Sequence, residues 1–436
     1  MRNPKRRIIP YPKGPTVTTP TAAIDALFAD GDKPDSPGCA LAVIRDGEIT
    51  YQRGYGMADL ENNTPITPDS VFYIASVSKQ FTAASVLLLA QSGALSLDDE
   101  IHRYFPELPD YGTPITIRHL LHHTSGLRDY LDLWELAGRS FDDPFTNQDG
   151  LKLLIRQRGL NFPPGEQHLY CNSGYKLLAE LPPRVAKLTL RQYADQHIFQ
   201  PLGMKNTFFD DDNAEIPNRV RSYKPTDDHF EEIPKNFTIV GSGGLLTTIG
   251  DLLQWDRNFY DPQVGGRDFV EQLQTPGMLN DGTRLDYAAG LVVGCYKGLK
   301  TVQHSGGMLG FRTHMLRFPD QRFTVICLGN LSSFDSDKQA TAIADLYLAD
   351  SYHLDEYAGS FYSEELDVTY ELAVEPPDLV LRSPSSLANP LRATEPDKFT
   401  AVGRELTFTR NHEGRVTDFT LNGGRAKGML FSRRES

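Results

Sequence analysis

Residues 76–93 read SVSKQFTAASVLLLAQSG, and this stretch carries more structural information than any other in the chain. It has no proline, has no glycine before Gly93 and is rich in alanine and leucine. This composition predicts a mostly buried helix that begins at Ser76 and ends at Gly93. Ser76 and Lys79 lie three residues apart, so in a helix their side chains meet on one face.

The Ser-x-x-Lys spacing suggests a nucleophile beside its base. A serine hydroxyl is a weak nucleophile until a neighbouring base takes its proton. A lysine amine acts as that base only when burial or nearby cations deprotonate it. The pattern has two free positions and also occurs by chance on protein surfaces, so the pair alone leaves a chance match open.

Strand patterns lie on both sides of this helix. The apolar run 38–45 is joined to residues 49–53 by the turn dipeptide Asp46-Gly47, which predicts a β-hairpin. Further strand patterns cover 290–296, 301–304, 313–318 and 323–328, and a helical pattern follows at 337–348. The order hairpin, helices, strands, helix predicts an α+β fold with an antiparallel sheet flanked by helices.

The length of 436 residues is enough for two or three domains. Residues 1–20 contain five basic residues, five prolines and no acidic residue, which predicts a flexible basic tail. We expect residues 21–350 to form the main domain, with a helical insert at about 110–260. Residues 352–436 show short strand patterns separated by turn residues, which predicts a small all-β domain.

The charge of the chain excludes several function classes. The 44 Lys and Arg residues against 57 Asp and Glu residues give a net charge of −13, which disfavours nucleic acids and anionic membranes as partners. No segment approaches the roughly 20 apolar residues of a membrane span, and no apolar run follows the basic N-terminal residues as in a secretory signal. We expect no nucleic-acid partner, no membrane span and a cytoplasmic location, or a periplasmic or secreted one if a signal was removed. The four cysteines form no C-x-x-C pair, which argues against a zinc ribbon or a disulfide scaffold.

Two further motifs follow Ser76 in order along the chain. Tyr170-Cys171-Asn172 is a Y-x-N motif, and His304-Ser305-Gly306 lies on a strand pattern and is followed by Gly307. With these motifs the sequence resembles the class C β-lactamase-like serine hydrolases, a group that includes penicillin-binding D-alanyl-D-alanine carboxypeptidases, D-aminopeptidases and family VIII carboxylesterases. The resemblance covers about residues 21–350 and extends to the segments 123–127 (HTSGL), 201–204 (PLGM) and 241–248 (GSGGLLTT). It implies a β-lactamase-like fold with a helical subdomain, and members of the group sometimes carry a C-terminal β-barrel.

The resemblance implies a role for each residue of the first two motifs. Ser76 would be the nucleophile that forms an acyl-enzyme, and Lys79 would help to remove its proton. Tyr170 would share this base role and protonate the leaving group. Asn172 would hold Lys79 and a substrate amide oxygen.

The third motif would bind the substrate. The backbone N–H groups of Ser76 and Gly307 would form the oxyanion hole, and Gly306-Gly307 would let substrate lie close to the strand. His304 and Ser305 would lie on the substrate-binding side. His304 replaces the lysine of many β-lactamases and peptidoglycan peptidases, and a histidine is charged only part of the time near neutral pH. This departure favours a D-aminopeptidase-like or esterase-like function over a β-lactamase.

The sequence therefore predicts a serine hydrolase that acts through a Ser76 acyl-enzyme on esters, small amides or D-amino-acid peptides. The alternatives are a β-lactamase or D-alanyl-D-alanine carboxypeptidase, and a non-catalytic peptidoglycan or ligand sensor. We expect a small-molecule or short-peptide substrate, no cofactor and no metal, and the sequence leaves a homo-oligomer open. The need for one deprotonated base and one proton donor predicts a bell-shaped pH profile.

Two local patterns have simpler interpretations. His119, His122 and His123 have helical spacing, but no acidic or cysteine partner accompanies them. We interpret them as histidines at a helix C-terminal end and not as metal ligands. Pro182-Pro183 interrupts a helical pattern that includes Tyr175, which predicts a break or kink there.

Overall fold

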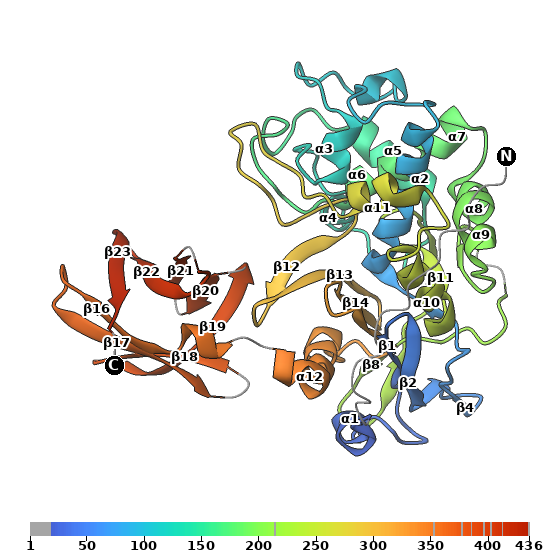
Figure 1. Cartoon of the computed structure of the whole chain (residues 1–436). Helices are drawn as coiled ribbons and strands as arrows, with labels where there is room; N and C mark the ends of the chain where they lie inside the picture. Colours follow the sequence, from blue (N-terminus) through green and yellow to red (C-terminus); the bar gives the residue numbers. More distant parts are fainter. Residues whose placement is uncertain are drawn as a thin grey trace, which may run out of the picture.

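The computed structural model describes residues 19–434 except 213–214, 352–353, 376–377, 385, 396, 402 and 412. Residues 1–18 of the expected basic tail therefore lie outside the described residues. The main part of the molecule is built on a six-stranded antiparallel sheet (Figure 1). In spatial order its strands are β12 (Val292–Tyr296), β13 (Leu299–Met308), β14 (Phe311–Phe318), β15 (Phe323–Gly329), β1 (Cys39–Arg45) and β2 (Glu48–Tyr55).

The hairpin β1–β2 forms as the Asp-Gly turn predicts. Asp46 and Gly47 have φ angles of 53° and 78°, and a two-residue type I′ turn requires positive φ at both central positions. On its other side β1 pairs with β15 along its whole length. Both strands are buried almost throughout, which explains why their sequences are apolar without alternation.

Helices cover both faces of this sheet. On one face α1 (Thr21–Phe28) and α12 (Ser336–Leu348) pack over the strands. Leu41 of β1 belongs to the core on this face, and the adjacent Ala42 belongs to the core on the opposite face. This division follows from the two-residue period of side chains along a strand.

The helical part of the chain covers the opposite face. Its central helix is α2 (Lys79–Gln91), which follows the 3₁₀ turn η1 (Ala75–Ser78) and has ten buried residues among its 13. The other helices and helical turns are η2 (Ile101–Arg103), α3 (Ile117–Leu121), α4 (Tyr130–Leu136), α5 (Asn147–Ile155), α6 (Asn172–Ala179), α7 (Leu181–Val185), α8 (Leu190–Ala194), η3 (Asp195–Phe199), α9 (Gln200–Leu202), α10 (Ile249–Asn258) and α11 (Gly266–Leu273). Among the described residues, no helix is both long and apolar enough to cross a membrane.

Short strands connect and brace these helices. They are β3 (Met57–Asp59), β4 (Thr64–Pro65), β5 (Phe72–Tyr73), β6 (Phe145–Thr146), β7 (Phe208–Phe209), β8 (Tyr223–Pro225), β9 (Phe230–Glu232), β10 (Phe237–Thr238) and β11 (Leu245–Thr247). The break predicted at Pro182-Pro183 is present, because α6 ends at Ala179 and α7 begins at Leu181. Prolines lack the N–H that would continue α6, but they fit the first turn of a new helix.

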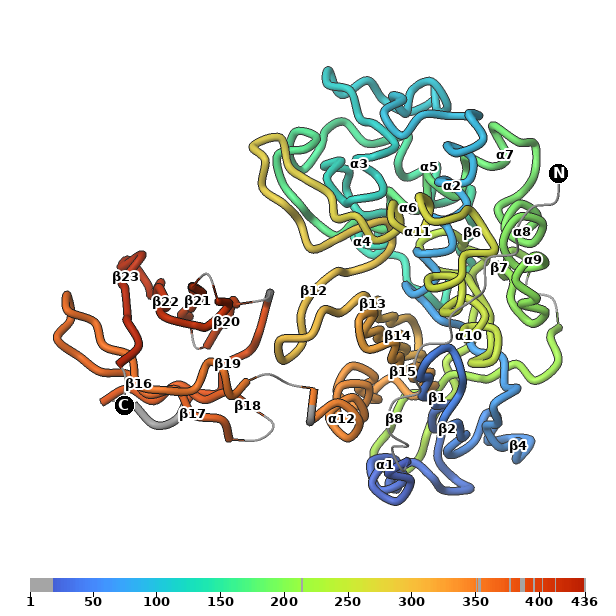
Figure 2. The backbone as a smooth tube through the Cα atoms, in the orientation of Figure 1, coloured from blue at the N-terminus to red at the C-terminus, as the bar shows by residue number. Residues whose placement is uncertain are grey.

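The C-terminal region forms a closed antiparallel barrel. After η4 (Ala349–Ser351) and η5 (Leu354–Tyr357) its strands are β16 (Gly359–Ser363), β17 (Val368–Glu375), β18 (Asp378–Ser383), β19 (Ser386–Glu395), β20 (Lys398–Ala401), β21 (Arg404–Arg410), β22 (Val416–Gly423) and β23 (Ala426–Arg433). The barrel lies beside β12, the edge strand of the main sheet, which contacts β19 (Figure 2). Cys295 of β12 packs against the barrel core.

A buried ion pair ties α10 to the main sheet. Arg317 of β14 and Asp256 of α10 are each 1% exposed, and Nε of the arginine lies 2.8 Å from Oδ1 of the aspartate. The hydroxyl of Thr324 donates to the same oxygen at 2.8 Å, and the guanidinium lies 3.8 Å from the centre of the Phe259 ring. Each charge therefore depends on the other for compensation, because water does not reach either group.

We expect Arg317→Met to lower the free energy of unfolding by about 3–5 kcal/mol, because it leaves the Asp256 carboxylate buried without its cation. The double variant Arg317→Met/Asp256→Leu removes both charges and should recover much of this loss. Urea unfolding followed by tryptophan fluorescence measures both effects. A double variant less stable than Arg317→Met would contradict the explanation.

Candidate active site

Ser76 lies in the turn that leads into helix α2. The predicted helix is present, but residues 75–78 form a 3₁₀ turn and the α-helix begins at Lys79. Ala75 has a φ of +48°, a conformation that is strained for a residue with a Cβ and that occurs often at active sites. The Ser78 hydroxyl holds the turn, because it donates to the Ala75 carbonyl at 2.5 Å and accepts from the Leu245 N–H at 3.1 Å.

Lys79 is fully buried next to Ser76. Its Nζ donates to Ser76 Oγ at 3.0 Å, to Asn172 Oδ1 at 2.9 Å and to the Ser242 carbonyl oxygen at 2.7 Å. Burial lowers the pKa of Lys79 to about 7, and the negative charge of Asp129 opposes this shift only in part. The amine is therefore deprotonated in much of the population at neutral pH and can accept a proton from Ser76.

Tyr170 and Asn172, just before and at the start of α6, also lie beside Lys79. The Asn172 N–H donates to Asp129 Oδ2 at 2.5 Å, which fixes this helix end. The Lys79 Nζ lies 4.8 Å from the centre of the Tyr170 ring. Removal of water raises the pKa of Tyr170 well above its usual value, although a hydrogen bond with Ser76 opposes the shift. Tyr170 is thus a phenol at neutral pH. The lowered pKa of Lys79 and the raised pKa of Tyr170 favour Lys79 as the base and Tyr170 as the proton donor.

His304 of β13 is buried beside this group. Its Nδ1 lies 2.6 Å from the Ser305 carbonyl oxygen, and its Nε2 lies 3.0 Å from the Tyr287 hydroxyl. Since a carbonyl oxygen only accepts, Nδ1 carries the proton and Nε2 accepts from Tyr287. Burial, with help from the positive charge of Lys79, lowers the pKa of His304 to about 3. The interpretation that His304 is charged part of the time near neutral pH is therefore wrong, because the ring is neutral there.

Gly306 and Gly307 have different surroundings. A Cβ on Gly306 would lie 2.4 Å from the Ile74 carbonyl oxygen and 3.0 Å from the Ser76 nitrogen. The nucleophile turn, and not substrate as expected from the sequence, is therefore what approaches Gly306 closely. Gly307 is exposed, like Ser305, and faces the cleft around Ser76.

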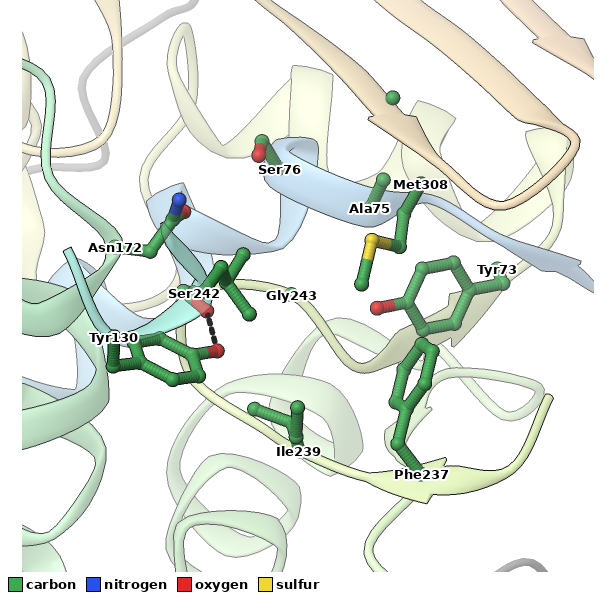
Figure 3. Close-up of a pocket in the computed structure, with 12 residues that line it drawn as sticks. Tyr73, Ala75, Ser76, Tyr130, Asn172, Phe237, Ile239, Ser242, Gly243 and Met308 are labelled. Carbon is green, nitrogen blue, oxygen red and sulfur yellow. Dashed lines mark hydrogen bonds between the residues drawn. The ribbon is translucent and has the colours of Figure 1, made fainter. Parts of the chain in front are cut away.

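Two cavities meet at the nucleophile. The smaller, about 60 Å³, is lined mainly by apolar and uncharged groups, among them Tyr73, Phe237, Ile239 and Met308 (Figure 3). The larger, about 380 Å³, is lined by Ser76, His168, Tyr170, Asp286, Tyr287, Val292, His304, Ser305 and Gly307. Ser76 and Gly307 are the residues shared by the two linings. A substrate carbonyl at Ser76 would thus direct its two substituents into different cavities.

The sequence analysis assigned no role to several groups at this site. His123, part of the HTSGL segment, is 1% exposed and its Nδ1 accepts from the Cys171 N–H at 3.1 Å. Its ring centre lies 4.4 Å from that of Tyr170 and 4.4 Å from that of Tyr287. The HTSGL segment was the available signal for His123, and the GSGGLLTT segment was the available signal for Ser242, whereas nothing local in the sequence marks Tyr287.

The interpretation of the three clustered histidines needs correction. His119 belongs to the N-terminal capping box of α3, where its Nδ1 accepts from the Thr116 N–H at 3.2 Å. Burial lowers the pKa of all three histidines, that of His122 to about 4. They are therefore neutral and do not act as charged partners of a helix C-terminus. In the part of the chain that the structure describes, no group of three or more histidine, cysteine or acidic residues has an arrangement suited to a metal ion.

Comparisons with known proteins agree with this geometry. A model of the Beta-lactamase family matches residues 24–349. Penicillin-binding protein 4* of Bacillus subtilis (strain 168) is 33% identical over 329 residues, which are 71% of each chain. A D-aminopeptidase of Gluconobacter oxydans (strain 621H) is 28% identical over 310 residues, which cover 71% of this chain and 58% of that protein. The structure of the octameric penicillin-binding protein homologue from Pyrococcus abyssi matches 95% of this chain and 100% of its own, with a TM-score of 0.68 at 22% identity.

The fold and the comparisons identify a serine hydrolase, in which Ser76 and Lys79 share one helix start. The chain belongs to the β-lactamase family. The predicted fold class is confirmed, both for the antiparallel sheet flanked by helices and for the C-terminal β-barrel. The chain spans less than two thirds of the length of the D-aminopeptidase.

We expect kcat/KM for an ester to rise with pH through about 7, because deprotonation of Lys79 creates the base. Below about pH 6 the value should fall roughly tenfold per pH unit. The raised pKa of Tyr170 moves the falling limb of the predicted bell to strongly alkaline pH, so a plateau should extend to about pH 9. Initial rates at constant ionic strength measure the profile, and a rate independent of pH between 5 and 8 would rule out Lys79 as the base.

His123 offers a second test, because the hydrogen-bond acceptor and the bulk of its side chain can be changed separately. An asparagine at this position keeps a side-chain acceptor near Nδ1 and tolerates the φ of +57°, whereas a leucine keeps bulk and loses the acceptor. We expect His123→Leu to lower kcat by about ten- to a hundredfold, since the Cys171 N–H loses its partner and Tyr170 loses its position. His123→Asn should retain several times more activity than His123→Leu.

Circular dichroism spectra of both His123 variants would control for folding. Equal kcat values for the two variants would show that the Cys171 hydrogen bond does not position the site.

Proposed function

We propose that this chain hydrolyses esters or small amides with a small uncharged acyl group through an acyl-enzyme on Ser76. The observation that carries the proposal is the 3.0 Å contact between Ser76 Oγ and the buried Lys79 amine, at the point where the two cavities meet. The volume of about 60 Å³ and the uncharged lining of the smaller cavity favour a small acyl group.

In the proposed reaction Lys79 takes the proton of Ser76, and Oγ attacks the substrate carbonyl carbon. The backbone N–H groups of Ser76 and Gly307 stabilise the negative charge on the carbonyl oxygen. When the tetrahedral intermediate collapses, Tyr170 gives its proton to the leaving oxygen or nitrogen and regains one from Lys79. A water molecule then attacks the acyl carbon and gives one proton to Lys79. The bond between Oγ and the acyl carbon breaks, Oγ takes the proton from Lys79, and the carboxylic acid leaves.

The same site is less suited to a β-lactamase or a D-alanyl-D-alanine carboxypeptidase. Both kinds of substrate carry a carboxylate next to the reacting group. The described residues that line the two cavities include no lysine or arginine, and His304 is neutral. A non-catalytic sensor is disfavoured as well, because the proposed nucleophile, base and proton donor are all in contact. The octameric relative from Pyrococcus abyssi, which matches nearly the whole chain, supports a homo-oligomer.

The proposal is tested with intact-protein mass spectrometry after treatment with a fluorophosphonate probe, and with rates for short-chain p-nitrophenyl esters and a chromogenic cephalosporin. We expect a single phosphonyl adduct and at least a hundredfold faster ester than cephalosporin turnover. Ser76→Ala should abolish both adduct and ester turnover, because among the described residues Ser76 has the side-chain hydroxyl that accepts a hydrogen bond from Lys79 Nζ.

The opposite results are equally informative. Cephalosporin turnover equal to that of the best ester would replace the proposal with the β-lactamase alternative. Adduct formation without turnover of any substrate would favour the sensor. Retention of ester hydrolysis in Ser76→Ala would exclude Ser76 as the nucleophile.

A further inference from the structure

The two cavities differ in what they offer to the two halves of a substrate. Tyr170 lines the larger cavity and not the smaller one. Because Tyr170 is the proposed donor to the leaving atom, the leaving group occupies the larger cavity and the acyl group occupies the smaller one. This assignment rests on the proposed function.

Among the described residues that line the larger cavity, Asp286 is the one with a carboxyl group. His168 is neutral because desolvation lowers its pKa, although the charge of Asp286 opposes the shift. His304 is neutral for the reason given above, and the lining tyrosines have raised pKa values because burial disfavours the phenolate. Among the described residues of this lining there is no lysine or arginine to offset the carboxylate.

The Asp286 carboxylate is available to a ligand. The residue is exposed, and its backbone carbonyl accepts from the Val293 N–H at 2.7 Å, which holds it at the start of β12. No described side chain forms a hydrogen bond or an ion pair with the carboxylate. Its negative charge therefore faces the cleft and is not used by the fold.

The groups around Asp286 complement an organic cation and not only a charge. Tyr170 and His168 place exposed aromatic rings in the same lining, and the buried Tyr287 packs against both, with ring centres 6.0 Å and 5.9 Å away. Aromatic faces attract ammonium groups, and they bind quaternary ammonium groups particularly well. Val292 adds an apolar surface for the carbon atoms of such a group.

We propose that Asp286 and the aromatic groups beside it form a subsite for a positively charged leaving group. The preferred substrates are then small-acyl esters of amino alcohols or small-acyl amides of diamines and basic amino acids. The smaller cavity has no aspartate or glutamate among its lining residues, so a cation on the acyl half of the substrate has no such partner.

The test uses three butyryl thioesters whose leaving groups differ mainly in charge. These are butyrylthiocholine, its uncharged isostere S-(3,3-dimethylbutyl) thiobutyrate, and S-butyryl-3-mercaptopropionate, and each releases a thiol that is measured photometrically. We expect the wild-type protein to prefer the cationic over the neutral substrate in kcat/KM by about five- to tenfold. Asp286→Asn should remove this preference and leave the rate for the neutral substrate unchanged, and Asp286→Lys should favour the anionic substrate.

A matched control comes from the same loop. Asp281 is exposed, lies outside the lining of the larger cavity and bonds the Thr283 N–H at 2.8 Å. Asp281→Asn changes the net charge as Asp286→Asn does, and it should keep the cationic preference. An equal loss of the cationic preference in both variants would show that the preference comes from the net charge of the protein and not from Asp286. This result would overturn the subsite.

The remaining outcomes separate the subsite from the proposed function. Hydrolysis of all three thioesters by the wild-type protein without a charge preference would overturn the subsite and leave the serine hydrolase intact. A wild-type protein that hydrolyses none of them, nor any p-nitrophenyl ester, would instead contradict the proposed function.

Discussion

The burial of Lys79 is the constraint on which the active site depends. Lowering the pKa of this amine from 10.5 to about 7 corresponds to roughly 5 kcal/mol of added cost for its charged form. The interior accepts the group because three oxygen atoms from three separate segments surround it, on Ser76, Asn172 and Ser242. The start of α2, the start of α6 and the turn at 241–244 are therefore held together by the same group that activates the nucleophile.

A second constraint is the contact between β13 and the turn that carries Ser76. The absence of a side chain at Gly306 lets the strand approach the Ile74 carbonyl, and the Thr313 hydroxyl of the neighbouring strand donates to that carbonyl at 2.8 Å. This contact joins the sheet to the helical part at the nucleophile. It also brings Gly307 close to Ser76, and these two residues lie where the smaller and the larger cavity meet.

The sequence predicts much of this structure where the signal is local. The apolar runs, the Asp46-Gly47 turn and the spacing of Ser76 and Lys79 each determine a feature within a few residues. The roles of Tyr170 and Asn172 came from the family resemblance, and the structure does bring both to Lys79. Tyr287 could not be predicted in this way, because it reaches the site only through long-range packing. The 241–248 segment marked Ser242, but it did not indicate that the Ser242 carbonyl accepts from Lys79. The protonation states were also beyond the sequence, since they depend on burial, and this is why His304 is neutral and Tyr170 is a phenol at neutral pH.

The site combines a neutral aromatic interior with very little fixed charge. The rings of His123, His304 and Tyr287 lie beside that of Tyr170 and, being neutral at physiological pH, do not stabilise a substrate anion as a permanent cation would. In such surroundings a single exposed carboxylate has a large influence, because no opposite charge in the same lining cancels its field. Asp286 holds that position in the larger cavity. The proposals thus assign catalysis and selectivity to different parts of the cleft. The buried Lys79 determines the reactivity of Ser76, and the Asp286 carboxylate at the cavity wall determines which leaving groups bind well.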